Sequence, residues 1–167
     1  VYTDDGDSLE FDIKHRYNVL SEVINESSKK VLVFVPFKNV IDVLVDKLCK
    51  DNIPTEIIRG DVPPTKRTEI FQRFQETPEP RVLVIQPKAA AHGVTLTAAD
   101  TIVWWGPTSS VETYEQANAR IHRAGQTSKC TVIQLQGSHI EKRIYALLDN
   151  KLDAHTKIID LYKEILA

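Results

Sequence analysis

Short apolar runs alternate along this chain with segments whose apolar residues recur at helical spacing. The run at residues 31–35 is continuously apolar, which is typical of a strand buried on both faces of a sheet. Further runs predict strands over residues 55–59, 82–85, 101–105 and 131–135. Helical spacing predicts helices over about 11–26, 39–48, 64–74, 109–125 and 140–166, the last with a break near 153–156. We expect Asn39 to cap the second helix and Pro64 to begin the third.

Strands that alternate with helices predict an α/β fold, with a mainly parallel sheet and helices on both of its faces. Right-handed crossovers connect such strands, and ligands of such sheets bind at the carboxyl ends of the strands. We find no internal repeat and no linker that would divide the sequence. We therefore expect one domain over residues 30–150, with a lead-in and helix over 1–29 and a helical extension over 151–167.

The helix expected at 109–125 carries a stripe of polar side chains. Ser109 and Glu112 match the S-x-x-E capping box, and Gly125 is typical of a helix end. At about 100° per residue, one stripe contains Glu112, Gln116, Arg120 and Arg123, and the opposite side contains Tyr114, Ala117 and Ile121. We expect the apolar side to face the core and the stripe to face outward.

Two arginines three residues apart, Arg120 and Arg123, are the main candidates for binding chemistry. Two guanidinium groups on one helix face repel each other unless an anion lies between them. The planar fork of arginine matches phosphate oxygens in a bidentate way. The pair therefore indicates a site for a nucleoside triphosphate. The alternative is an ordinary solvated helix face, on which glutamine and arginine are common.

The loop after the third strand, residues 86–100, is the second candidate. Ala89, Ala90, Ala91 and Gly93 permit close approach of a ligand to the backbone at the carboxyl edge of the sheet. The side chains of Lys88, Thr95 and Thr97 can donate hydrogen bonds there. The alternative is an ordinary crossover loop in which Gly93 forms a turn.

The composition is that of an ordinary globular chain, with 167 residues and a net charge of −2. This charge provides no overall attraction to nucleic acid, so any such contact must come from a local basic patch. The two cysteines, Cys49 and Cys130, form no CxxC pattern and suggest reduced, buried thiols in a cytoplasmic protein. The spacing of the histidines predicts no metal site, and no apolar run suggests a membrane span. The chain begins at Val1 and lacks methionine, so we expect it to belong to a longer polypeptide.

Motifs in one order along the chain carry a resemblance. Residues 31–37 resemble motif IV of superfamily 2 helicases, and Arg59-Gly60-Asp61 followed by Arg67 and Phe74 resembles segment IVa. Residues 88–100 resemble motif V, and Gln116-x₃-Arg120-x-His122-Arg123-x-Gly125-Gln126 resembles motif VI. From about Lys30 to Leu148 the chain is similar to the second RecA-like lobe of these helicases, most closely that of Swi/Snf-like DNA translocases.

This resemblance implies a RecA-like three-layer sandwich that completes an ATPase site together with an N-terminal RecA-like lobe of the same polypeptide. ATP and Mg²⁺ would be held mainly by that other lobe. Arg123 would be the arginine finger that reaches the γ-phosphate, and Arg120 would support the same phosphate or position Arg123. Gln116 would couple the nucleotide state to closure of the lobes, and Gly93 and Thr95 would lie near the ribose and phosphates.

The resemblance also implies contacts with nucleic acid, most of them to backbone phosphates and therefore largely independent of sequence. Duplex DNA is the expected partner. The residues implied are Phe37, Lys38, Arg67, Lys88, Ala89 and Ala90. Trp105, at the end of a strand, is a candidate for stacking on a base, but a core or lobe-interface position is the more common one for such a residue.

Several positions depart from the family pattern. Thr95 stands where asparagine is usual, Ala90 and Ala91 where glycines are usual, and His92 where a small or apolar residue is usual. Residues 104–107, Trp-Trp-Gly-Pro, also differ from the family. These differences suggest a divergent bacterial or phage member, which would act in the cytoplasm; a eukaryotic member would be nuclear.

The chain contains no G-x-x-x-x-G-K-[ST] sequence and no Asp-Glu-x-His motif after a strand. We therefore expect this lobe alone to be inactive and to hold neither ATP nor Mg²⁺. In the longer protein we expect an ATP-dependent DNA helicase or translocase. The alternatives are an RNA helicase of the same superfamily and a non-catalytic RecA-like module that binds or regulates.

Overall fold

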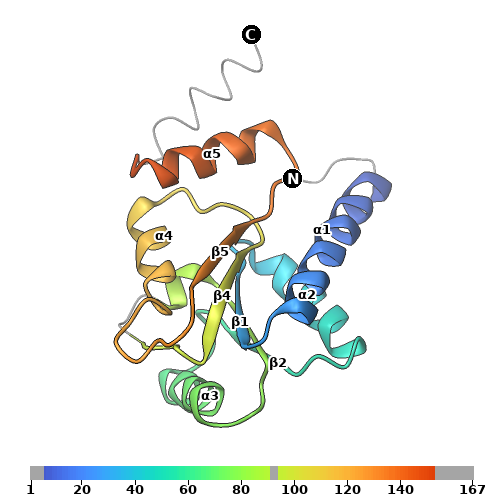
Figure 1. Cartoon of the computed structure of the whole chain (residues 1–167). Helices are drawn as coiled ribbons and strands as arrows, with labels where there is room; N and C mark the ends of the chain where they lie inside the picture. The colour runs from blue at the N-terminus through green and yellow to red at the C-terminus, as the bar shows by residue number, and fades with distance from the viewer. Residues whose placement is uncertain (1–5, 91–93, 153–167) are drawn as a thin grey trace.

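A computed structural model of the chain describes residues 6–90 and 94–152 (Figure 1). In these residues a central sheet is covered by helices on both faces. The elements in chain order are α1 (Gly6–Glu26), β1 (Lys30–Phe34), α2 (Lys38–Lys50), β2 (Thr55–Ile58), α3 (Pro64–Glu76), β3 (Val82–Ile85), the 3₁₀ turn η1 (Pro87–Ala90), β4 (Ala99–Trp104), α4 (Val111–Asn118), β5 (Thr131–Gln134) and α5 (His139–Asp149).

The five strands form one sheet in the order β2-β3-β1-β4-β5, and every neighbouring pair is parallel. The prediction of a parallel α/β sheet is therefore confirmed. Each predicted strand is present, with ends that differ by at most two residues from those expected. The agreement follows from burial: β1 and β3 are apolar on both faces, so their residues form unbroken apolar runs.

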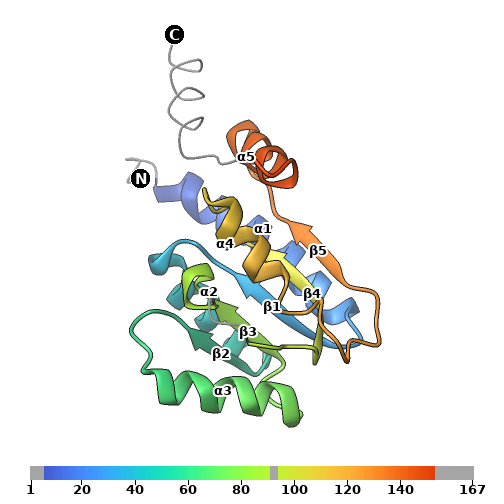
Figure 2. The same cartoon turned by 90° about the vertical axis from the view of Figure 1, so that its left-hand side faces the viewer.

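Two apolar clusters divide the core between the faces of the sheet. On one face, Val31 and Val33 of β1 pack with Leu20 of α1 and Leu44 of α2. On the other face, the alternate strand residues pack against α3, α4 and α5. Figure 1 shows α4 on the opposite side of the sheet from α1 and α2, and in Figure 2 α3 and α4 lie in front of the sheet with α1 behind it. The chain thus has three layers.

Arg16 connects α1 to the end of β4 and to the start of α5. Its Nη1 donates to the Trp105 carbonyl oxygen at 2.8 Å, and its guanidinium forms a bidentate ion pair with Glu141 of α5. Glu141 also accepts from the backbone N–H of Gly137, and the hydroxyl of Ser138 caps α5 by accepting from the backbone N–H of Glu141. One mostly buried ion pair therefore joins α1, the end of β4 and the start of α5.

Several helix ends were predicted wrongly. The first helix, α1, begins at Gly6 and not near residue 11, and α5 ends at Asp149, before the break that was expected. The N-cap position of α2 is Phe37 and not Asn39, two residues earlier than expected, and the Phe37 side chain makes no capping hydrogen bond. The helix expected over 109–125 is much shorter, since α4 covers only Val111–Asn118. Its cap is Ser110 and not Ser109, and the Ser110 hydroxyl accepts from the backbone N–H of Thr113. The arginine pair consequently lies after the helix, in a turn.

The remaining predictions have mixed outcomes. Trp105 is buried in the core, at 3% exposure, which agrees with the core position that is more common for such a residue. Cys49 is exposed on α2, so its prediction as a buried thiol was wrong, because it lies on the solvent side of that helix. The break expected near 153–156 lies outside the described residues. None of the described helices has both the length and the apolar character that a membrane crossing requires.

Truncation of a core phenylalanine tests this packing. Phe74 of α3 is fully buried against the sheet, so Phe74→Ala should lower the free energy of unfolding by about 3–5 kcal/mol. Phe37 is 53% exposed, and Phe37→Ala should change it by less than about 0.5 kcal/mol. Urea denaturation of both variants measures the difference. Equal losses would contradict the placement of α3.

Candidate functional site

The loops that follow β1, β3 and β4 surround a groove of about 400 Å³ at the carboxyl edge of the sheet. These three strands are neighbours in the sheet, so their loops emerge side by side. Ile144 of α5 also contributes to the lining. The lining residues are Pro36, Phe37, Gln86, Pro87, Lys88, Pro107, Thr108, Ser109 and Ile144.

The groove brings together Phe37 and Lys88, two of the residues predicted to contact nucleic acid. Both side chains are exposed, and Lys38, the exposed first residue of α2, directly follows Phe37. A cation and an aromatic ring at the rim of a groove suit a polyanion that carries bases. The loop after β4 adds the hydroxyls of Thr108 and Ser109, which sequence reasoning did not identify because only the strand order places them here.

Three other predicted residues are placed differently. Ala90 is buried in the core and Ala89 packs against it, so these two contribute the fold of η1 and not an accessible side chain. Arg67 does not line the groove. Its Nε donates to the carbonyl oxygen of Val62 and its Nη2 to that of Gly60, at 2.8 and 3.1 Å. Arg67 therefore holds the loop between β2 and α3.

The second part of the site is the turn after α4, which carries Arg120 and Arg123. Arg120 is buried, at 3% exposure, and not outward-facing as predicted from helical spacing. Its Nη1 lies 3.5 Å from the Val94 carbonyl oxygen, and among the described residues its Nε has no hydrogen-bond partner. Burial, and secondarily the neighbouring positive charge of Arg123, lowers the pKa of Arg120. A buried cation with so few partners is unfavourable unless an anion approaches it.

Arg123 is exposed, as predicted, and its Nε donates to the Ala119 carbonyl oxygen at 3.3 Å. Gln116 is half-buried on α4, where its amide donates to Glu112 one turn earlier. The exposed Thr95 follows Val94, whose carbonyl faces Arg120, so the structure brings the motif V segment next to the arginine turn. Gly93 lies outside the described residues.

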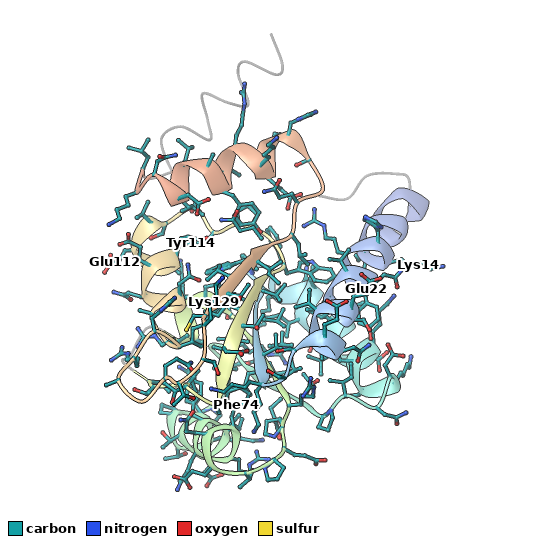
Figure 3. All side chains as sticks on the ribbon, viewed as in Figure 1. Lys14, Glu22, Phe74, Glu112, Tyr114 and Lys129 are labelled. Carbon is teal, nitrogen blue, oxygen red and sulfur yellow. The ribbon has the colours of Figure 1, made fainter. Side chains whose placement is uncertain are left out.

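Packing against β4 fixes the position of α4. The indole ring of Trp104 stacks on Phe34 and contacts the ring of Tyr114, with ring centroids 4.9 Å apart in each case. Its Nε1 donates to the side-chain oxygen of Asn118, the last residue of α4, at 2.8 Å. In Figure 3 Tyr114 points toward the body of the domain and Glu112 points away from it. The eight residues of α4, about 12 Å of helix, separate the groove from the arginine turn.

The donors in the arginine turn suit phosphate oxygens, and they do not suit a metal ion. In the described part of the chain, no group of three or more His, Cys, Asp or Glu side chains could hold a metal. The arginine turn therefore offers positive charge and hydrogen-bond donors.

Residues 15–125 match the family described as the helicase conserved C-terminal domain. The chain belongs to this family. The matched segment includes the groove residues of the β1, β3 and β4 loops and both arginines. It ends at Gly125.

Curated relatives extend the similarity to the Swi/Snf-like helicases that the motifs predicted. The chain is 30% identical over 163 residues to an uncharacterized ATP-dependent helicase of Mycoplasma genitalium, covering 93% of this chain and 15% of the relative. It is 30% identical over 165 residues to the ATP-dependent helicase ULS1 of Saccharomyces cerevisiae, covering 92% and 10%. It is 30% identical over 129 residues to the SWI/SNF-related matrix-associated actin-dependent regulator of chromatin subfamily A-like protein 1 of Xenopus tropicalis, covering 75% and 13%.

The chain thus spans only 10–15% of the length of these relatives. They come from a bacterium, a yeast and a frog, and a bacterial or phage source for this chain stays a prediction.

Solved structures confirm the RecA-like fold of helicase C-terminal lobes. The C-terminal part of the Fun30 ATPase domain superimposes with a TM-score of 0.77 at 21% identity, covering 90% of this chain and 53% of that one. The C-terminal domain of the DEAD-box protein Dbp5 superimposes with a TM-score of 0.71 at 20% identity, covering 82% and 78%. These two likenesses concern the fold alone.

Removal of the buried charge tests the electrostatics of the turn. Arg120→Met keeps a side chain of similar length and removes a cation that is poorly partnered, so it should raise the free energy of unfolding by about 1 kcal/mol. Arg123→Met, at an exposed position, should leave it nearly unchanged. Urea denaturation of both variants provides the comparison. A clear loss of stability in Arg120→Met would mean that Arg120 is well paired.

Proposed function

We propose that this chain is the C-terminal lobe of an ATP-dependent DNA translocase or helicase, and that its arginine turn serves an ATP molecule held mainly by an N-terminal lobe. The buried, poorly partnered guanidinium of Arg120 beside Arg123 is the observation that carries this proposal. Two cations held together without an acidic partner among the described residues suit the several negative charges of a triphosphate. The names of the curated relatives, which include ATP-dependent helicases, support ATP as the substrate.

In this proposal the two arginines of the turn and the residues near it have separate roles. Hydrolysis of ATP transfers the γ-phosphoryl group to water and supplies the free energy for movement. Arg123, exposed at the turn, donates to the γ-phosphate oxygens as an arginine finger. Arg120 supports the same phosphate or orients Arg123 from below. Gln116 couples the nucleotide state to lobe closure, and we assign contacts with the ribose and phosphates to Gly93 and Thr95. Mg²⁺ belongs to the other lobe.

The groove at the carboxyl edge is the proposed place for nucleic acid. Lys88 and Lys38 supply positive charge, and Phe37 offers a ring at the rim. Contacts of this kind reach phosphates and sugars and carry little sequence information. A motor that moves along duplex DNA requires contacts of this type, because it must bind each successive position with similar affinity.

The arginine finger is tested in the complete protein. Arg123→Ala should lower DNA-stimulated ATP turnover by about 10³–10⁵-fold, because charge that develops on the phosphoryl oxygens loses its donor. Affinity for DNA should stay nearly unchanged. Lys129→Ala, which removes an equal charge six residues later, is the matched control and should retain turnover.

Near-normal ATPase activity of Arg123→Ala would contradict the finger assignment. Parallel ATPase assays with duplex DNA and with RNA identify the nucleic acid on which the protein acts. We expect duplex DNA to stimulate ATP turnover more strongly than RNA. Stronger stimulation by RNA would identify an RNA helicase instead. A complete protein that binds nucleic acid without ATP turnover would indicate a non-catalytic module.

The groove is tested by salt-dependent binding in the complete protein. Lys88→Ala should weaken DNA binding to a similar degree for every sequence and should reduce the slope of log K against log salt by about one. Lys50 lies at the opposite end of α2, where it pairs with Asp46, so Lys50→Ala should change neither quantity. An unchanged slope for Lys88→Ala would exclude a phosphate contact by this residue.

A further inference from the structure

The side chain of Gln126 occupies the junction of three segments that are distant in sequence. Its Nε2 donates to the carbonyl oxygens of Ala99, at the start of β4, and of Ile121, at 2.8 and 3.1 Å. Its Oε1 accepts from the Nζ of Lys29, between α1 and β1, at 2.8 Å, and from the backbone N–H of Ser128 at 3.2 Å. These four hydrogen bonds use both donors and both acceptor positions of the amide.

Lys29 is the second member of this junction. Its Nζ donates to the Thr97 carbonyl oxygen at 3.0 Å as well as to Gln126. Thr97 belongs to the motif V segment that lies beside Arg120. Lys29 therefore connects the segment before β1 both to that segment and to the end of the arginine turn.

Both a backbone hydrogen bond and a side-chain hydrogen bond of Gln126 close the turn between Ile121 and Gln126. The backbone N–H of Gln126 donates to the Arg123 carbonyl oxygen at 3.1 Å, and Gly125 has a φ of 95°, which suits a glycine at the third position of a type II turn. The Gln126 side chain then returns to the Ile121 carbonyl. The backbone of Arg123 is thus held inside a small loop whose ends are both fastened by Gln126.

We propose that Gln126, oriented by Lys29, is a positioning residue that holds Arg123 in place for the phosphate. The inference rests on the proposed function of Arg123, and it adds two residues that touch neither nucleotide nor nucleic acid in that function. A guanidinium must reach the phosphoryl oxygens within a fraction of an ångström, and a displacement of about 1 Å can lower a rate about 100-fold. The hydrogen bonds of the Gln126 side chain, made at the amino edge of the sheet where β4 begins, hold the turn in one position and so fix the position of Arg123.

Gln126→Glu is the most informative substitution, because it keeps the shape and can still pair with Lys29. It replaces the two donated hydrogen bonds by contacts between a carboxylate oxygen and two carbonyl oxygens, which repel each other. Lys29→Met is the milder second variant, since it retains Gln126 and the lysine stem. Lys30→Met is the matched control: the Nζ of Lys30 also donates to two carbonyl oxygens, those of Phe74 and Thr77, but at the end of α3.

The experiment measures kcat and KM for ATP and the affinity for DNA in the complete protein. Gln126→Glu should lower kcat by about 10–100-fold with KM and DNA affinity unchanged, and Lys29→Met should lower kcat less. Lys30→Met should leave kcat unchanged. Hydrogen exchange should show faster exchange confined to residues 119–128 in the first two variants. A normal kcat in both variants, or equal losses in Lys30→Met, would overturn the proposal.

A double-mutant cycle with Arg123→Lys separates positioning from a general structural role. If Gln126 acts through Arg123, Gln126→Glu should lower kcat far less in the Arg123→Lys background than in the wild type. Independent, multiplicative losses would overturn the positioning role. Normal kcat in Arg123→Lys and Arg123→Ala would instead refute the proposed function itself. Loss in the Arg123 variants with a normal kcat in Gln126→Glu and Lys29→Met would refute only the inference about Gln126.

Discussion

The parallel pairing of β1 with β3 on one side and β4 on the other is the constraint on which the rest of this lobe depends. Because parallel strands run in one direction, the segments after all three emerge at a single edge and can surround one groove. The same pairing leaves β1 with no edge exposed to water. Its residues alternate between the two apolar clusters, and helices must therefore cover both faces.

This constraint explains what could be predicted from the sequence. Strands buried on both faces are visible as apolar runs, and residues that directly follow them, such as Phe37 and Lys88, can be assigned to the carboxyl edge without a structure. Thr108, Ser109 and Ile144 could not be assigned to the groove in this way. Their position depends on β4 lying next to β1 and on α5 returning across the sheet, and neither arrangement leaves a signal in local spacing.

The end of α4 shows a different limit of prediction. Helical spacing alone continues past Asn118, and Gly125 is a plausible helix stop. In the fold, the Asn118 side chain accepts from the indole N–H of Trp104, and the Arg120 carbonyl oxygen accepts from the backbone N–H of Leu96. These long-range hydrogen bonds compete with the next helical turn and replace it. Arg120 therefore points inward, although a helical stripe would have placed it outward.

The inward position of Arg120 has an energetic meaning for the lobe as a whole. A guanidinium at 3% exposure, beside a second cation, loses hydration that its long contact with the Val94 carbonyl only partly restores. The ring contacts of Trp104 with Phe34 and Tyr114 hold α4 against the sheet, and α4 leads directly into the turn. Under the proposed function, a phosphate that reaches the turn offsets the lost hydration of a cation that is already in place. Closure of the two lobes would then gain most when the nucleotide carries its γ-phosphate and less after that phosphate leaves, which is the asymmetry that a nucleotide-driven motor requires.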